Sequence, residues 1–312
     1  MRKLENKKID FQNFLKKQKM PIGVVCNDAG SANLISHWLK DIYKELNINC
    51  YLEGPARKIF KNVCPKINYL DLRVLIDSSS TLLTGTGWAS TLEHDSRKLM
   101  KAKKGKNISV LDHWTNYKER FISGSDVIFP EMIIVSDPIG FKLAKKTFLN
   151  IEIKEFNNDY LSNICNLISN IQINANEPSK NILYVLEPIR DDWGKLEQPG
   201  EFIALDYFVK NIRKIGFKKD LSIKLRKHPS EEKEKYLNWI SLNKSLNISI
   251  ESENSLEQSI DWADTVVGCQ TFAMVIALNA GRKVLTTIPP NMPKCKLPHK
   301  DILTIEKLTR IF

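Results

Sequence analysis

The stretch PIGVVCNDAGSANLISHWLKDIYKEL, residues 21–46, decides the fold class of this chain. Its first six residues form an apolar run that is typical of a buried strand, and the polar turn NDAGS follows. Beyond the turn, apolar residues recur at helical spacing, so we expect a helix that packs one face against a sheet. This face consists of Leu34, Ile35, Trp38, Leu39, Ile42 and Tyr43. Strand, turn and packed helix make up the repeating unit of a parallel α/β sheet.

The same alternation continues along the chain in two series. The first series has predicted strands at residues 48–54, 81–87, 107–114, 126–137 and 151–156, and Ser90 with Glu93 is spaced as a capping box at the start of a helix. A polar, aperiodic segment at residues 173–181 separates it from the second series. There the predicted strands are residues 182–188, 221–229, 246–252, 264–269 and 283–289, and the predicted helices are residues 202–215, 230–240, 255–263 and 271–281. We therefore expect an α/β protein with two Rossmann-like domains, residues 1–175 and 176–312, whose parallel sheets face each other across a cleft.

Composition narrows the class of partner. The net charge of +11 favours an anionic partner such as a nucleotide, a phosphorylated substrate or a membrane surface. Because the lysines are dispersed and no nucleic-acid-binding module is recognisable, we expect no nucleic acid partner. The six cysteines show neither CxxC pairs nor zinc-ligand spacing, which predicts no metal site and a reducing cytoplasm. With no signal peptide or membrane span, any membrane contact is expected at the inner surface.

The turn after the first strand is one candidate site. Gly30 and Ser31 permit a close approach of backbone to a ligand, and Asp28 is placed where a carboxylate can meet a sugar or a base. The alternative is that Asn27 and Asp28 only form the turn. Since the chain has neither a GxGxxG fingerprint nor a P-loop, dinucleotide binding and P-loop hydrolysis are disfavoured.

The segment VLDHWTNYKERF, residues 110–121, is a second candidate on the same rim. Asp112 ends its strand, and a carboxylate there can accept a proton from an alcohol. The nearby Trp114 and Tyr117 can form a wall for a sugar ring, or they can be ordinary packed aromatics.

Two corners of the second domain are suited to a phosphate. Arg226 and His228 lie at the carboxyl end of a predicted strand, before Pro229 and a helix that we expect Ser230 to cap. The alternative is a plain corner whose histidine bonds a backbone carbonyl.

The other corner consists of Gly268, Gln270 and Thr271, between a strand and the apolar helix 271–281. Backbone amides and the Thr271 hydroxyl can hold a phosphate there, although the helix itself is predicted to be core. Gly281 is placed to end this helix.

Taken together, His228-Pro229, Thr271 and Asp112 resemble motifs of bacterial GT-B-fold glycosyltransferases, in particular the sialyltransferase and polysialyltransferase group and its capsule-synthesis relatives. That group has an HP motif, a Ser/Thr motif at a later helix start, and an acidic motif in the N-terminal domain. His113 and Trp114 replace the second acid and the glycine of the acidic motif. The resemblance implies that His228 contacts the donor phosphate, that Asp112 is the general base and that the donor is CMP-linked.

We therefore expect an inverting, metal-independent glycosyltransferase of surface polysaccharide or glycolipid synthesis. It would need no cofactor beyond its nucleotide-sugar donor, with the acceptor on the N-terminal domain and the donor on the C-terminal domain. Asp112 is the first choice for the base and Asp28 the second. Two other functions stay open, a nucleotide-sugar 2-epimerase and a nucleotide-sugar or glycan-binding protein without catalysis.

Overall fold

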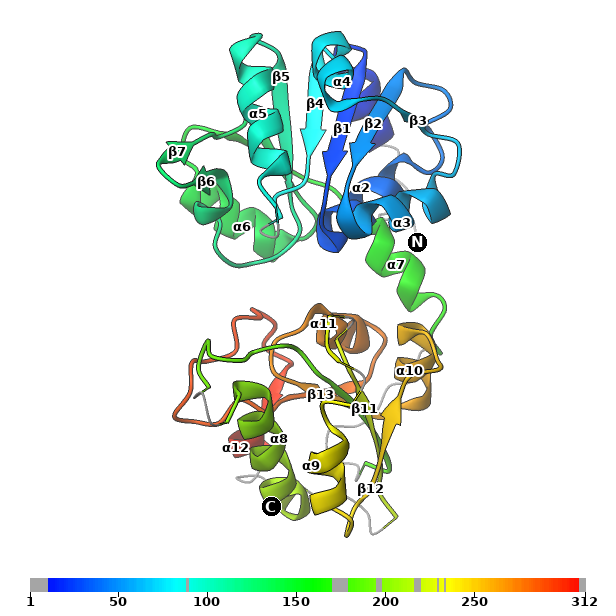
Figure 1. Cartoon of the computed structure of the whole chain (residues 1–312), viewed down its shortest axis with the longest axis vertical. Coiled ribbons are helices and arrows are strands. Elements are labelled where there is room, and N and C mark those ends of the chain that lie inside the picture. Colours follow the sequence, from blue (N-terminus) through cyan, green and yellow to red (C-terminus); the bar gives the residue numbers. More distant parts are fainter. Residues whose placement is uncertain are drawn as a thin grey trace. The chain divides into compact units, whose positions relative to one another are not determined.

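The fold consists of two units, Met1–Ser162 and Asn163–Phe312, seen here in a computed structural model (Figure 1). The structure describes residues 11–87, 90–169, 179–194, 198–215, 220–228, 230–232 and 234–308. Most of the predicted linker 173–181, the predicted domain boundary at residue 175 and Pro229 lie outside the described residues.

The first unit is built on a sheet of seven parallel strands. Across the sheet they run β3 (Asn68–Tyr69), β2 (Ile48–Leu52), β1 (Ile22–Cys26), β4 (Thr81–Thr84), β5 (Lys106–Leu111), β8 (Met132–Val135) and β9 (Glu152–Glu155). A hairpin of β6 (Ile122–Ser123) and β7 (Asp126–Val127) follows the short helix η1 (Glu119–Phe121). The predicted strand 126–137 is therefore two strands, and Pro130, which has no amide hydrogen to donate, lies in the gap between them.

Helices cover both faces of this sheet. They are α2 (Ala29–Leu39), α3 (Gly54–Val63), α4 (Leu72–Ser78), α5 (Leu92–Ala102) and α6 (Pro138–Thr147). The helix α7 (Asp159–Cys165) follows them and crosses the boundary to the second unit. Alternate strand residues point to opposite faces, so Val24 packs with the core of α2 and α3 while Val25 packs with that of α4 and α5. The predicted apolar face of residues 34–43 is buried throughout.

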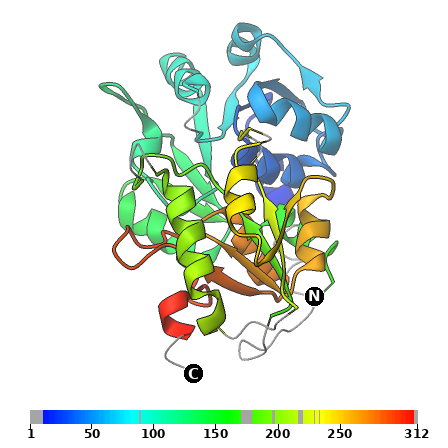
Figure 2. The same ribbon diagram turned by 60° about the horizontal axis from the view of Figure 1, so that its bottom comes forward.

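The second unit has a sheet of six parallel strands. Their order is β12 (Asn247–Glu251), β11 (Ser222–Arg226), β10 (Asn181–Val185), β13 (Thr265–Gly268), β14 (Lys283–Thr286) and β15 (Leu303–Thr304). The helices are α8 (Gly200–Asn211), which continues into η2 (Ile212–Ile215), α9 (Leu237–Leu242), α10 (Leu256–Trp262), α11 (Phe272–Asn279) and α12 (Ile305–Leu308). Figure 2 shows α8 and α9 side by side on one face of this sheet, where they share an apolar core with α12.

Two sequence predictions about helix starts are wrong. The predicted helix 230–240 begins only at Leu237, because Glu231 turns inward and accepts hydrogen bonds from the Tyr236 hydroxyl at 2.8 Å and the Lys235 ammonium at 2.7 Å. Ser230 therefore caps no helix. The predicted capping box fails as well, since α5 starts after Thr91 and the Glu93 side chain bonds elsewhere.

The order of strands places polar turns at the topological switch point of each sheet, where successive strands are added on opposite sides of the central strand. β1 lies between β2 and β4, and β10 lies between β11 and β13, so successive crossovers leave the central strand on opposite sides. Ligands of parallel α/β sheets bind at the carboxyl ends of strands at such switch points. The turns after β1 and β4 meet at this place in the first unit, and those after β10 and β13 meet at it in the second.

The predicted fold class, α/β with two parallel-sheet units, is confirmed. Gly281 has φ of +77° just after α11, as predicted for a helix end. All six cysteines are free thiols. Among the described residues, no helix is both long and apolar enough to cross a membrane.

Candidate functional site

The two acidic residues predicted for the first unit meet at the carboxyl ends of β1 and β5. A Cβ atom built on Gly30 would lie 1.7 Å from Asp112 Oδ2, and one built on Gly87 would lie 3.0 Å from Asp28 Cγ. Both positions need glycine because a carboxylate occupies the space of a side chain. The Asp112 carboxylate therefore takes up the space beside Gly30, and the approach of a ligand to this backbone stays a prediction.

Asp112 is held by a cation. Arg120 Nη1 donates to Asp112 Oδ1 at 3.0 Å, and the two side chains are only 6% and 12% exposed. The same nitrogen donates to the Thr86 carbonyl at 3.0 Å, and Arg120 Nε donates to the Thr115 carbonyl at 3.1 Å. These bonds fix the guanidinium against β4 and β5, so the Asp112 carboxylate has a defined orientation.

Glu93 is a third carboxyl group in this cluster. Its Oε1 accepts the Asn27 amide hydrogen at 2.8 Å, and its Oε2 is buried with no hydrogen-bond partner among the described residues. Burial raises the pKa of Glu93. Nothing in the sequence marks Glu93 as part of the site, because its spacing from Ser90 predicts a helix cap.

Asp28 has a strongly raised pKa. Burial raises its pKa to about 7, with further contributions from the negative charges of Asp112 and Glu93, while Arg120 and a hydrogen bond from Ser31 act in the opposite direction. Asp28 Oδ1 is buried without a hydrogen-bond partner in the described part of the chain. A carboxyl group with this pKa exchanges its proton near neutral pH, which suits a general base or acid.

Ser31 lies against the strands and is fully buried. Its Oγ accepts the Thr86 amide hydrogen at 3.4 Å. Because it contacts the turn after β4 and Asp28, its position fits support of the acidic cluster, and contact with a ligand stays a prediction.

Cys26 ends β1 beside the cluster. Sulfur and oxygen atoms of Cys26, Asp28 and Glu93 lie within 4.8 Å of one another, so these residues could hold a metal ion. Burial and the nearby carboxylates raise the pKa of Cys26 far above its ordinary value, so its thiol stays neutral. The sequence expectation of a metal-independent site stays a prediction.

The aromatic residues of the second candidate segment differ in their roles. Tyr117 is buried, and its hydroxyl donates to the Gly140 carbonyl at 3.4 Å, which agrees with the packing alternative. Trp114 Nε1 donates to Asp137 Oδ2 at 2.9 Å, and Asp137 caps α6. Trp114 is therefore held in place while it stays partly exposed, so it can still form a wall beside the cluster.

In the second unit, the chain itself occupies part of the predicted phosphate corner. Thr271 caps α11 by accepting the Ala273 amide hydrogen at 3.4 Å. The backbone amide of Gln270 donates to Glu187 Oε1 at 3.0 Å, and burial raises the pKa of Glu187 to about 7. Glu187 follows β10 and was missed, because nothing in the sequence marks a strand-end glutamate as the partner of this amide.

Gly268 has a packing role. A Cβ atom there would lie 2.8 Å from the Val185 carbonyl oxygen on the adjacent strand. Its own carbonyl accepts the Thr287 amide hydrogen at 2.8 Å. The absence of a side chain therefore serves the close contact between β13 and β10, and a role in ligand binding is a prediction.

The other predicted corner follows β11. Arg226 Nη1 donates to the Asn254 carbonyl at 2.7 Å and to Ser259 Oγ at 3.0 Å, so its guanidinium is fixed beside the start of α10. His228 is exposed, and its Nδ1 lies 2.7 Å from Ser230 Oγ. That hydrogen bond orients the ring. An oriented, exposed imidazole at a strand end remains available to a ligand.

Comparison with known proteins bears on the fold. No family model matches the chain, and no curated protein matches it by sequence. Solved structures that are similar to the chain include three that match it across 86% of its length. S. aureus MnaA, in a structure with UDP, has a TM-score of 0.58 at 11% identity, with 79% of that protein covered.

A candidate UDP-N-acetylglucosamine 2-epimerase from Listeria monocytogenes has a TM-score of 0.56 at 9% identity, with 79% covered. Anabaena Alr3699/HepE, in complex with UDP, has a TM-score of 0.52 at 9% identity, with 80% covered. The fold is GT-B-like. At such low identity the similarity establishes the fold alone.

Proposed function

We propose that the protein is an enzyme that acts on a nucleotide sugar, breaking the bond between the anomeric carbon and the phosphate oxygen. The observation that carries the proposal is the Asp28 carboxyl group, held beside Asp112 and Glu93 with a pKa of about 7 at a sheet switch point. The two structures with UDP share the fold, and they support a uridine nucleotide over the CMP-linked donor expected from the sequence.

For the reaction we favour transfer of the sugar to an acceptor hydroxyl. Asp28, ionised, takes the proton of the hydroxyl while the acceptor oxygen bonds to the anomeric carbon. The bond from that carbon to the phosphate oxygen breaks, its electron pair leaves with the nucleotide, and a single displacement inverts the sugar. This reverses the order expected from the sequence, since Asp112 is engaged by Arg120 and is better suited to orienting the reactants.

The second unit would hold the departing nucleotide. His228 is exposed and oriented, and Thr271 starts α11, so both can donate to phosphate oxygens. A phosphate near Gln270 would approach Glu187, whose pKa of about 7 allows it to take up a proton and lose its charge. That the two sheets face a common cleft stays a prediction.

A 2-epimerase is the second candidate, and the pairing of Asp28 with Glu93 favours it. Epimerisation requires a proton to be removed from a carbon and returned to its other face, so two carboxyl groups with raised pKa values suit it. A binding protein without catalysis is the remaining alternative.

Incubation with nucleotide sugars tests these functions. Thermal shifts with UDP, CMP, GDP and dTDP would first identify the base, and we expect UDP to give the largest shift. UDP-GlcNAc would then be incubated with and without glycan acceptors, and the products separated by chromatography. UDP release that requires an acceptor supports transfer, ManNAc or its nucleotide supports epimerisation, and binding without turnover in any mixture would contradict both enzymatic proposals.

His228→Ala gives the residue-level test in the second unit. We expect it to weaken UDP binding and slow turnover, whereas Lys244→Ala, at an exposed site of the same unit, should change neither. A His228→Ala variant with the full rate would remove His228 from the proposed site.

A further inference from the structure

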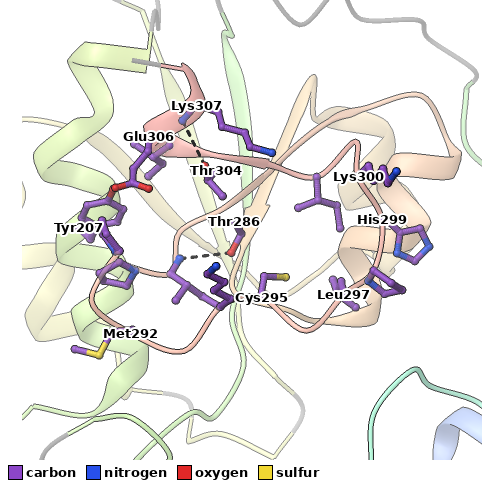
Figure 3. A pocket seen from close by; sticks show the side chains of 17 residues that line it. Tyr207, Thr286, Met292, Cys295, Leu297, His299, Lys300, Thr304, Glu306 and Lys307 are labelled. Atoms are coloured by element: carbon purple, nitrogen blue, oxygen red, sulfur yellow. Dashed lines mark hydrogen bonds between the residues drawn. The ribbon is translucent and has the colours of Figure 1, made fainter. Parts of the chain in front are cut away.

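The second unit contains a cavity that the proposed reaction does not use. It has a volume of about 580 Å³, which is within the range of about 300–1,000 Å³ that is typical of small-molecule sites. Figure 3 shows Tyr207 of α8 and Glu306 on one side, Lys300 and His299 on the opposite side, and Thr286 and Cys295 between them. The segment between β14 and β15, residues 287–302, forms most of the wall.

Part of the cavity lining is apolar. Seven of the 17 lining residues are aliphatic residues and prolines, namely Ile288, Pro289, Pro290, Leu297, Pro298, Ile302 and Ile305. The two threonine hydroxyls beside them are already engaged, since Thr286 Oγ1 donates to the Cys269 carbonyl at 2.8 Å and Thr304 Oγ1 accepts the Lys307 amide hydrogen at 3.3 Å. The apolar part of the lining suits the hydrocarbon body of a ligand.

The mouth of the cavity is basic. Lys294, Lys300 and Lys307 are exposed lining residues, and Glu306 is the one carboxylate among the lining residues. Among the described residues, none of these three ammonium groups is in an ion pair. Exposed cations around an apolar cavity favour an anionic group at the mouth.

The wall segment is anchored at several points, so the cavity is a built feature. The Thr287 amide donates to the Gly268 carbonyl at 2.8 Å, and the Lys296 amide donates to Gln270 Oε1 at 3.2 Å. Its four prolines have restricted backbone angles and no amide hydrogen to satisfy. A preformed cavity loses less conformational entropy when a ligand binds.

From these features we propose that the cavity binds an amphipathic organic phosphate, with the apolar body inside and the phosphate group at the lysines. Lys294 and Lys300 bind the phosphate, and Ile288 and Leu297 contact the hydrocarbon. The proposal does not depend on nucleotide-sugar chemistry, because it concerns residues that the proposed reaction does not use. The ligand can come from solution or from a phosphate-bearing lipid of a membrane surface.

Decyl phosphate, titrated into the full chain by calorimetry below its micelle concentration, is the probe. We expect saturable binding that is about tenfold or more tighter than that of inorganic phosphate or of uncharged decanol, because only decyl phosphate fills both the cavity and its mouth. The double variant Lys294→Gln, Lys300→Gln should bind decyl phosphate about tenfold more weakly. The control variant Lys180→Gln, Lys244→Gln should bind it as the wild type does, although it loses the same charge from exposed positions of this unit.

Ile288→Trp provides a second variant, since a larger side chain at this partly exposed position fills the cavity without removing a charge. Thermal denaturation shows whether each variant is folded. The proposal would be overturned if decyl phosphate showed no saturable binding to the wild-type chain. It would also be overturned if the pocket variants bound decyl phosphate as tightly as the control variant, or if inorganic phosphate bound the wild type as tightly as decyl phosphate.

Vesicles of phosphatidylcholine, with and without phosphatidic acid, distinguish the two sources of ligand. Lysine-dependent binding to the phosphatidic acid vesicles, together with decyl phosphate binding, assigns a membrane source. Decyl phosphate binding without vesicle binding assigns a soluble ligand.

Discussion

Asp28→Asn should raise the free energy of unfolding of the first unit at neutral pH and leave it unchanged at pH 4 and below. The folded pKa of Asp28 is about 7 and the ordinary value is 3.8, a difference of about 3 units. At about 1.4 kcal/mol per unit, keeping this carboxylate ionised in the fold costs about 4 kcal/mol at pH 8. Because the folded pKa is the higher one, the cost is absent below pH 4, grows between pH 4 and 7, and is constant above pH 7. The variant lacks this cost, so its advantage over the wild type should grow over the same pH range.

Urea unfolding of both proteins at several pH values from 4.5 to 8 measures this difference. Pulsed hydrogen exchange read on peptides from β1 and β4 isolates the transition of the first unit from that of the second. Asp77→Asn serves as the control, because its side chain is 62% exposed and the substitution removes the same charge. A stability difference for Asp28→Asn that does not change with pH would refute the reasoning that burial and neighbouring carboxylates perturb Asp28.

Further predictions concern the same cluster. Gly30→Ala places a methyl group in the position of the Asp112 carboxylate. It should lower the free energy of unfolding by about 2–4 kcal/mol, since the loss of the buried ion pair exceeds the helix-propensity gain of alanine. At Gly124 nothing lies near the added atom but φ is positive, so Gly124→Ala measures the cost of the backbone alone, and an equal loss at both positions would contradict the steric argument. Glu93→Gln keeps the hydrogen bond from the Asn27 amide and removes the charge, so carbon NMR titration should find the pKa of Asp28 below 7; an unchanged value would show that Glu93 does not influence Asp28.

The fold was largely predictable because strands and one-sided helices leave clear periodic patterns. The apolar runs of β1, β4, β5, β10 and β13 are bounded by polar turns, and each forms a strand. The errors occur where side chains bond to partners distant in the sequence or nearby in an irregular turn. Glu93 bonds the amide of Asn27, 66 positions away, instead of the start of its own helix. Glu231 is engaged by Lys235 and Tyr236, so the helix expected at residue 230 starts at Leu237.

The site was predictable in part for the same reason. Asp28 and Asp112 could be placed on one rim because both follow strands of a parallel sheet. The raised pKa of Asp28 could not be predicted, since it depends on the burial of its carboxyl group and on the charges of Asp112 and Glu93 beside it. Likewise, the contact of Glu187 with the Gln270 amide joins two strand ends that lie 83 positions apart.

The central claim is that Asp28 provides proton transfer in a reaction that breaks a nucleotide sugar. Phosphorus NMR of UDP-GlcNAc mixed with the wild-type chain, with and without glycan acceptors, tests it most directly, with Asp28→Asn and Asp77→Asn measured in parallel. We predict that the sugar-linked phosphate signal is lost or converted at matching rates with the wild type and Asp77→Asn, and at a rate lower by about 100-fold or more with Asp28→Asn. Equal rates for the wild type and Asp28→Asn, or an unchanged spectrum with every protein, would contradict the claim.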